Sequence, residues 1–549
     1  MNILGLHCGV HDGSACIVKD GRLVVAISSE RITRNKKRGG VTKEVIEYVL
    51  DEADITLDDV DVIALSNYSF NTTGDVLELF DGHNKIEELD DEVHYPSDLY
   101  FDAKILGIDK KAIVINHHLA HSASAYYTSN FTNAVCFSLD SSGFISRYNS
   151  SICIGDGKKL FYKKHTDLMI GSVYSVFTRA LGFGEPVFKA GSLMGMAAYG
   201  EPSEKLIKRI KLYIHESKAE GFENHIQNTI KFIDNWSNEN ITSNLTNEYI
   251  LTGKTNDKNV DSLSKLNSKN IMNLSASIQY LFEKAIMDKI EKEIILYGEK
   301  NICLSGGSFL NCNVNSIIYN SQVFDNIHLF PACGDDGISV GAALYVAHHI
   351  YDEDRYDYQN NEISYLGRNQ NYIEPDYKFI AEQIANNKVI AWFMGRSEFG
   401  PRALGNRSIL ADPRVAHNRD ILNFTVKNRE WFRPFAPSVL EEKAHEWFSG
   451  PMPSPFMLYT QKVLQPNRVP AITHVDGSAR IQTVNKNDNL PFYSLIKEFD
   501  NLTGVPLILN TSLNGNGTPI LETEDDAIDL FESNKNIDIL VLNGTIVHR

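Results

Sequence analysis

The arginines of a glycine-rich segment, residues 395–408, are the side chains of this chain best suited to bind an anion. Arg396, Arg402 and Arg407 stand there among glycines and one proline, a composition that disfavours a helix or a strand. Guanidinium groups on a loop can bind phosphate oxygens bidentately. Further cations follow at Arg414, Lys427, Arg429 and Arg433. In a chain with a formal net charge of -17, this concentration favours a bound polyphosphate or acyl phosphate, and arginines paired with the protein's own carboxylates are the alternative.

Two histidines one helical turn apart form a candidate metal site. His117 and His121 stand at i and i+4, so both imidazoles lie on one face of a helix. Asp140 follows one apolar strand, and the pair Asp335 and Asp336 follows another. Imidazoles with a carboxylate suit iron(II), manganese or zinc better than calcium. The pattern leaves open which of the two adjacent acids is the ligand, and packed or solvated histidines are the alternative.

Two further turns could bind phosphate or nucleotide. Gly306 and Gly307 stand between a predicted strand and a predicted helix, where backbone amides and the helix N-terminus can receive phosphate. Asn311, one turn into that helix, can face the same ligand. Asn510 and Ser512 follow an apolar strand, and ligands commonly bind at strand ends. Ordinary turns without a ligand would give the same pattern.

The elements that must position these residues follow an α/β pattern. A strand at 3–8 and a hairpin at 15–28 recur as a strand at 133–139 and a hairpin at 149–164, each pair joined by a polar loop. This repetition predicts duplicated α/β halves around a shared cleft. An apolar stripe predicts a long helix over 273–297.

Composition shifts predict two domains. Residues 1–350 form the first, with an insertion at about 203–270 that is rich in Asn, Lys and Ser. Residues 351–374 lack periodicity and are predicted to be a linker. Residues 375–549 form the second domain, which opens on an apolar strand.

The overall composition indicates a soluble globular protein. Of the 549 residues, 43% are hydrophobic and 22% are charged, and no apolar run is long enough to span a bilayer. The seven cysteines are scattered, and the N-terminus does not resemble a signal peptide, so we expect a cytoplasmic protein with reduced thiols. The net charge of -17 argues against a nucleic-acid partner. The sequence is compatible with a homodimer as well as with a monomer.

Taken together, these segments resemble the O-carbamoyltransferase family of antibiotic and nodulation-factor biosynthesis. The resemblance covers essentially the whole chain, and several long motifs in one order are far more specific than any single motif. The matching segments are residues 11–12, 30–36, 117–121, 193–200, 304–315, 334–341, 398–414 and 510–514.

The resemblance implies an N-terminal actin/hexokinase-like domain and a C-terminal YrdC-like domain. It also implies that the second domain makes carbamoyl adenylate from carbamoyl phosphate and ATP, with Mg²⁺ on the ATP. The first domain then transfers the carbamoyl group, with metal assistance, to a hydroxyl of a small molecule or saccharide. Iron(II) is the expected metal, with zinc and manganese as alternatives.

The same resemblance assigns roles to single residues. The implied metal ligands are His117, His121, Asp140 and Asp335. His11, Asp12 and Lys36 are implied in the transfer step, and Arg402 is implied in catalysis at the carbamoyl phosphate site. The implied carbamoyl phosphate and nucleotide contacts are Lys427, Arg433, Arg480, Asn510, Ser512, Gly306, Gly307 and Asn311.

Two other functions fit parts of the pattern. A tRNA threonylcarbamoylation enzyme would combine the same two domain types, and the net charge of -17 counts against it. A nucleotide-binding module without catalysis would leave His11, Lys36 and the histidine pair without a role. The acceptor cannot be identified, because an insertion such as 203–270 would shape its pocket.

Overall fold

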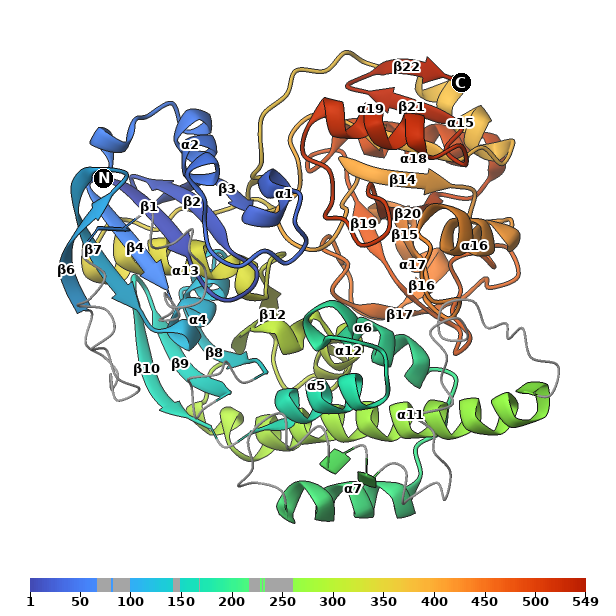
Figure 1. The fold of residues 1–549 in the computed structure, drawn as a ribbon, viewed down its shortest axis with the longest axis horizontal. Coiled ribbons are helices and arrows are strands. Elements are labelled where there is room, and N and C mark those ends of the chain that lie inside the picture. The colour runs from blue at the N-terminus through green and yellow to red at the C-terminus, as the bar shows by residue number, and fades with distance from the viewer. Residues whose placement is uncertain are drawn as a thin grey trace.

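The chain has a mixed α/β fold, as predicted, built within the described residues on three larger sheets and one small sheet (Figure 1). The structure is a computed structural model that describes residues 1–66, 80–81, 99–141, 149–166, 168–216, 228–229, 231–232 and 260–549.

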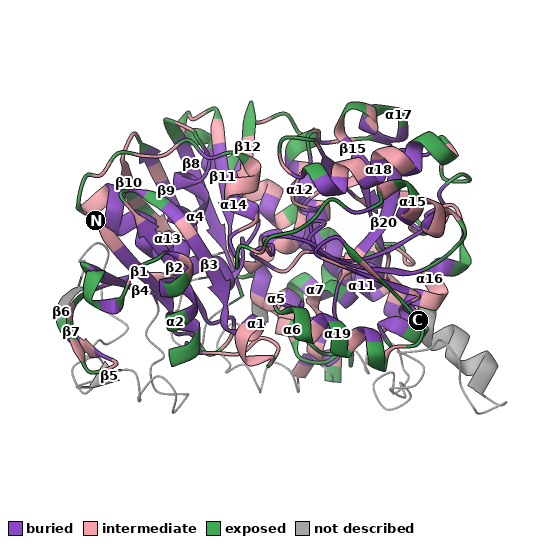
Figure 2. Ribbon diagram, turned by 90° about the horizontal axis from the view of Figure 1, so that it is seen from above, coloured by how far each residue is buried: buried purple, intermediate pink, exposed green. Residues whose placement is uncertain are grey.

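The first sheet contains seven strands in the order β3-β2-β1-β4-β7-β6-β5. Their bounds are β1 Asn2–His7, β2 Ser14–Lys19, β3 Arg22–Ser28, β4 Val62–Ser66, β5 Phe80–Asp81, β6 Leu99–Ile105 and β7 Ile108–Ile115. Successive side chains of a strand point to opposite faces, and in β1 both faces are apolar. Leu4 packs with Val45 of helix α2 (Lys43–Glu52), whereas Ile3 packs with Val340 of helix α13 (Ile338–Tyr345). The sheet is therefore covered on both sides, and Figure 2 shows its central strands as buried.

The second sheet repeats this plan. Its order is β10-β9-β8-β11-β12, in which a hairpin pairs antiparallel with the first strand and two parallel strands follow, as in β3-β2-β1-β4-β7. The bounds are β8 Asn133–Leu139, β9 Ser150–Asp156, β10 Lys159–His165, β11 Asn301–Ser305 and β12 Asn326–Leu329. The predicted recurrence of a strand and a hairpin is thus confirmed.

Two helices pack together between the sheets. Helix α4 (His117–Tyr127) contacts β8 and β11 of the second sheet, while α13 contacts β1 and β4 of the first. Asn116 caps α4, because its side chain accepts a hydrogen bond from the backbone N–H of His118 at 2.8 Å. This cap fixes where the helix begins and sets both site histidines on its first turns.

A layer of helices extends from the second sheet. It contains α5 (Ile170–Ala180), α6 (Pro186–Ala197), α7 (Glu204–Glu216), α11 (Val260–Lys292) and α12 (Cys312–Asn320). Helix α11 begins earlier than the predicted helix over 273–297, because its N-terminal stretch has no Gly or Pro to interrupt it. Apart from α7, the start of α11 and a few short pieces, the predicted insertion lies outside the described residues.

The third sheet is formed by the C-terminal part of the chain and lies at the upper right of Figure 1. Its seven strands have the order β19-β15-β20-β14-β13-β21-β22. The bounds are β13 Ile390–Phe393, β14 Arg407–Ala411, β15 Ala436–Leu440, β19 Gln482–Val484, β20 Leu507–Ser512, β21 Ile539–Leu542 and β22 Thr545–His548. Helices α15 (Tyr377–Ala385) and α18 (Leu490–Thr503) pack against each other, and α18 also contacts β15 and β20. The small sheet joins β16 (Phe448–Ser449), β17 (Thr460–Val463) and β18 (Ser478–Arg480).

The segment predicted as a linker, residues 351–374, contains one short helix, α14 (Asn360–Ser364). Tyr358, Ile363 and Leu366 of this segment are buried, and Leu366 O accepts a hydrogen bond from Ala26 N at 3.1 Å. The connection is therefore packed against β3 rather than free in solvent.

Candidate functional site

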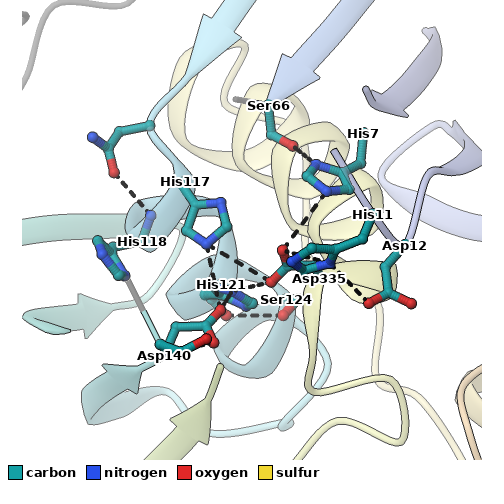
Figure 3. A network of polar contacts seen from close by, with 12 residues as sticks. His7, His11, Asp12, Ser66, His117, His118, His121, Ser124, Asp140 and Asp335 are labelled. Carbon is teal, nitrogen blue, oxygen red and sulfur yellow. Dashed lines mark hydrogen bonds and ion pairs between the residues drawn. The ribbon is translucent and has the colours of Figure 1, made fainter. Parts of the chain in front are cut away.

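The four predicted metal residues lie together where strands of the two N-terminal sheets end (Figure 3). His121 Nε2 lies 3.2 Å from Asp140 Oδ2 and 3.3 Å from Asp335 Oδ1. His117 Nε2 lies 3.6 and 3.8 Å from the same two oxygens. One nitrogen or oxygen from each residue lies within 4.8 Å of the others. Two imidazoles and two carboxylates at this spacing can hold iron(II), manganese or zinc.

Within this cluster, the carboxylates stabilise the protonated imidazole and the imidazoles stabilise the ionised carboxylates. Burial on its own lowers the pKa of His121, but the contacts of its ring with Asp140 and Asp335 outweigh burial and raise that pKa to about 9. Burial raises the pKa of Asp140, yet both histidines hold it well below its usual range. A cation bound among these groups would compete with a proton for the imidazole of His121, because a metal ligand must be the neutral ring.

The two glycines of the predicted phosphate turn lie directly against this cluster. Gly306 adopts a φ of +97°, and a Cβ there would lie 2.2 Å from Leu139 O. A Cβ on Gly307 would lie 2.9 Å from Asp140 Oδ1. Gly306 needs to be glycine, because its φ is left-handed and a side chain would meet the backbone at the end of β8, whereas a side chain at Gly307 would press only on the Asp140 carboxylate.

Two of the predicted transfer residues, His11 and Asp12, lie on the other side of Asp335 (Figure 3). His11 Nδ1 lies 3.1 Å from Asp12 Oδ2 and 3.6 Å from Asp335 Oδ2. Lys37, the neighbour of the predicted Lys36, binds Asp12 Oδ1 through its Nζ at 2.7 Å. Burial lowers the pKa of His11, but the hydrogen bond to Asp12 and the charge of Asp335 raise it to about 9. Asp336 is not part of the four-residue cluster, and burial together with the charge of Asp12 raises its pKa to about 7.

Three of the predicted arginines, Arg402, Arg433 and Arg480, form a second group that reaches back to the first part of the chain, whereas Arg396 and Arg407 bind backbone carbonyls and Arg414 pairs with Asp412. Arg402 NH2 donates to Leu310 O at 3.4 Å, and the buried Nε atoms of Arg402 and Arg480 have no hydrogen-bond partner among the described residues. Burial lowers the pKa of Arg480 to about 9, and the positive charges of Arg402 and Arg433 act in the same direction. Burial lowers the pKa of Lys36 as well, and Arg433 is among the cations that add to this effect. These cations are placed close together with donors to spare, which is the electrostatic condition for an anion site.

The remaining predicted residues make contacts within the protein. Lys427 Nζ donates to Asn514 Oδ1 at 2.6 Å and to Ser512 Oγ at 3.2 Å. Asn510 Nδ2 donates to Ser438 Oγ at 2.9 Å. Lys427 thereby holds the loop that follows β20, and the amide of Asn510 joins two strands of the third sheet.

Asn311 caps α12 and pairs with a neighbouring glutamine. Its Oδ1 accepts from Val314 N at 3.4 Å, and its Nδ2 donates to Gln279 Oε1 at 3.0 Å. In this arrangement its amide faces helix α11, so any contact with a ligand would require it to leave Gln279.

Sequence reasoning missed four residues of these two groups. His7, at the end of β1, is fully buried and points its Nε2 toward Asp335 Oδ2 at 4.0 Å. Lys37 stands next to a predicted residue, while Lys189 and Glu430 are joined at 2.6 Å across 241 positions of the chain. A carboxylate inside the cationic run 427–433 was the one signal that could have pointed to Glu430.

Among the helices that the structure describes, none has both the length and the apolar character required to cross a bilayer.

Two family models match the chain in order. The carbamoyltransferase N-terminus matches residues 2–344, and the carbamoyltransferase C-terminus matches residues 381–549. A solved structure of the activator of the 2-hydroxyisocaproyl-CoA dehydratase from Clostridium difficile aligns with 63% of this chain and 94% of its own. The identity is 12% and the TM-score 0.33, values too low to indicate a function.

Several relatives match most or all of the chain. The uncharacterized protein sll1178 of Synechocystis sp. is 33% identical over 100% of this chain and 96% of its own length. Nodulation protein NolNO of Sinorhizobium fredii is 32% identical over 98% of this chain and 79% of its own length. Nodulation protein NolO of Bradyrhizobium diazoefficiens is 33% identical over 79% of each chain. On these matches, the chain belongs to the carbamoyltransferase family of enzymes.

Proposed function

We propose that the enzyme forms carbamoyl adenylate from carbamoyl phosphate and ATP, and then transfers the carbamoyl group to a hydroxyl of a small molecule or saccharide. The observation that carries this proposal is the placement of a cation group with unused donors beside a cluster of two histidines and two carboxylates. Arg402 belongs to the first group, and its guanidinium contacts Leu310, which closely follows the Gly306–Gly307 turn. A polyanion and a polarised carbonyl could therefore be handled in neighbouring places.

The proposed division of labour follows the two parts of the chain. Residues 1–350 would be an actin/hexokinase-like transfer domain, and the repeated five-strand order supports this. Residues 375–549 would be a YrdC-like domain, with residues 351–374 as the connection. The YrdC-like assignment rests on the family resemblance.

In the first half-reaction, the arginine group brings two anions together. Carbamoyl phosphate and ATP with Mg²⁺ repel each other, and Arg402, Arg433 and Arg480 offset that repulsion. Water takes the phosphoryl group of carbamoyl phosphate, which releases phosphate and leaves carbamate. A carbamate oxygen then bonds to the α-phosphorus of ATP, and the bond to the β-phosphate oxygen breaks, so that pyrophosphate leaves.

In the second half-reaction, the acceptor oxygen bonds to the carbamoyl carbon, and the bond from that carbon to the AMP oxygen breaks. His11 is proposed to take the hydroxyl proton, held in place by Asp12 through Nδ1 at 3.1 Å. Asp335 is one of the charges that keep His11 protonated, and that charge is offset when Asp335 holds a metal. Lys36 is proposed to contact the carbamoyl adenylate from the loop between the two groups.

His117, His121, Asp140 and Asp335 are proposed to hold a divalent metal, with iron(II) preferred and zinc or manganese as alternatives. A bound metal would supply a Lewis acid that polarises the carbamoyl carbonyl or the hydroxyl. The protein contributes the ligand arrangement, because helix α4 carries both histidines and the turn at Gly306 and Gly307 lies against Leu139 and Asp140. We propose that the enzyme works in the cytoplasm without a nucleic-acid or membrane partner.

The experiment that tests this proposal measures products without and with an acceptor. With ATP, Mg²⁺ and carbamoyl phosphate alone, we expect one pyrophosphate and one phosphate for each ATP consumed. A panel of hydroxylated acceptors should then add AMP and a carbamate ester in equal amounts. Formation of ADP, or AMP release that does not depend on carbamoyl phosphate, would contradict the proposal.

A further inference from the structure

A buried carboxylate lies inside the cation group, and no role in the proposed chemistry uses it. Glu430 has 1% of its surface exposed. Its Oε1 accepts hydrogen bonds from Lys189 Nζ at 2.6 Å and from Ser192 Oγ at 3.1 Å. Its Oε2 lies 3.8 Å from Arg433 NH1 and has no hydrogen-bond partner among the described residues. One carboxylate therefore pairs with two cations, and its Oε2 still accepts no hydrogen bond from the described residues.

The partners of Glu430 come from both parts of the chain. Lys189 and Ser192 lie on α6, whereas Arg433 follows Glu430 by three residues. Arg433 NH1 also donates to Ser192 Oγ at 3.0 Å. Gly191 of the same helix lies next to this arginine, since a Cβ there would be in ordinary contact with Arg433 Nη2 at 3.7 Å. Glu430 thus fastens α6 to the segment that carries the proposed phosphate ligands.

The charges around Glu430 are unbalanced in favour of cations. Burial raises the pKa of Glu430, but Arg433 and Lys189 hold that pKa at about 2, so the group is ionised at neutral pH. Arg433 and Lys189 are also among the positive charges that lower the pKa of Lys36. The Arg433 and Lys189 side chains keep 26% and 32% of their surface exposed, which leaves both reachable by an anion from solvent.

We propose that Glu430 is an internal counter-ion that holds Lys189 and Arg433 until the phosphate groups of the substrates take its place. This inference rests on the proposed function, since it assumes that the cation group binds phosphate. Glu430 is a positioning residue, which keeps two mutually repelling cations at the site while no substrate is present. An incoming phosphate competes with Glu430 for both cations, so the carboxylate also limits how tightly a free polyanion binds.

The test compares the wild-type protein with Glu430→Gln, which keeps the shape and removes the charge. Pyrophosphate is the probe, measured by calorimetry and by the thermal midpoint with and without it. We expect Glu430→Gln to have a lower midpoint without pyrophosphate, because Lys189 and Arg433 lose their counter-ion. We also expect it to bind pyrophosphate more tightly, on the order of tenfold, because the competing charge is gone. Equal pyrophosphate affinity in the two proteins, or a midpoint deficit that pyrophosphate does not reduce, would overturn the proposal.

A matched control is Asp500→Asn. Asp500 is another buried carboxylate held by lysines, since Lys443 Nζ lies 2.6 Å and Lys497 Nζ 3.6 Å from its Oδ2, and neither lysine belongs to the cation group. Asp500→Asn should lower the midpoint equally with and without pyrophosphate. If neither the wild type nor Glu430→Gln binds pyrophosphate, the counter-ion proposal is wrong. If Glu430→Gln binds it more tightly while the wild type forms no carbamoyl adenylate, the counter-ion role stands and the proposed reaction fails.

Discussion

Replacing two arginines of one loop by alanine should have different effects, a loss of rate at Arg402 and a loss of stability at Arg396. Among the described residues, Arg402 makes one weak hydrogen bond, 3.4 Å long, and its buried Nε has no partner. Arg396 instead donates to Gly367 O and Val24 O at 2.6 Å each, and to Leu366 O at 3.3 Å. Arg402 has donors available for a ligand, whereas the donors of Arg396 hold the fold.

The size of the effect follows from the number of hydrogen bonds lost. A bidentate phosphate contact contains two charge-assisted hydrogen bonds, each contributing about 1.5–3 kcal/mol. Arg402→Ala should therefore slow adenylate formation by about 3 kcal/mol or more, which is on the order of a hundredfold. Its thermal midpoint should stay close to that of the wild type.

The assay is exchange of labelled pyrophosphate into ATP, dependent on carbamoyl phosphate, together with thermal unfolding. Arg396→Ala is the control, and it should lower the free energy of unfolding by about 2 kcal/mol through the lost carbonyl contacts. In its folded fraction the KM for carbamoyl phosphate should be unchanged. An Arg402→Ala protein that exchanges at the parental rate would refute the reasoning, as would one that unfolds as early as Arg396→Ala.

The remaining predictions concern the metal cluster. His121→Ala should lose bound metal and make no carbamate ester, yet it should still exchange pyrophosphate, because the arginines are unchanged; metal content and both half-reactions measured together decide this. Asp335→Asn should lower metal affinity by more than about tenfold and Asp336→Asn by much less, because of these two acids only Asp335 lies with the two histidines. If a chelator competition ranked the two variants in reverse, Asp336 would be the metal ligand. Gly307→Ala should also weaken metal binding, since its Cβ would lie 2.9 Å from Asp140 Oδ1; unchanged metal affinity would show that the loop gives way.

Local patterns in the sequence pointed to four residues that the structure brings together, His117, His121, Asp140 and Asp335. The i, i+4 spacing of His117 and His121 works because α4 begins at His117, and a carboxylate after a strand reliably marks a sheet edge. The repeated strand and hairpin predicted two sheets with the same order, since hairpins and parallel pairings follow from chain order.

Contacts between distant segments could not be predicted in this way. No local pattern joins Lys189 to Glu430, because their pairing depends on how α6 packs against the C-terminal part. The contact between Lys37 and Asp12 is a second example. Lys37 adopts a φ of +59°, and this turn directs its ammonium to Asp12. A left-handed φ is uncommon for residues other than glycine, asparagine and aspartate. The amino-acid composition of this segment therefore does not predict a left-handed φ at Lys37.

The most direct test of the central claim is to search for carbamoyl adenylate itself. The enzyme would be mixed, without an acceptor, with ATP labelled in the adenosine and with carbamoyl phosphate labelled at carbon, and the quenched mixture would be analysed by mass spectrometry. We predict one species that carries both labels, formed together with pyrophosphate and consumed when a carbamoyl acceptor is added. If the two labels never appear in one molecule while a carbamate ester still forms, the carbamoyl group reaches the acceptor without an adenylate, and the proposed two-step mechanism is wrong.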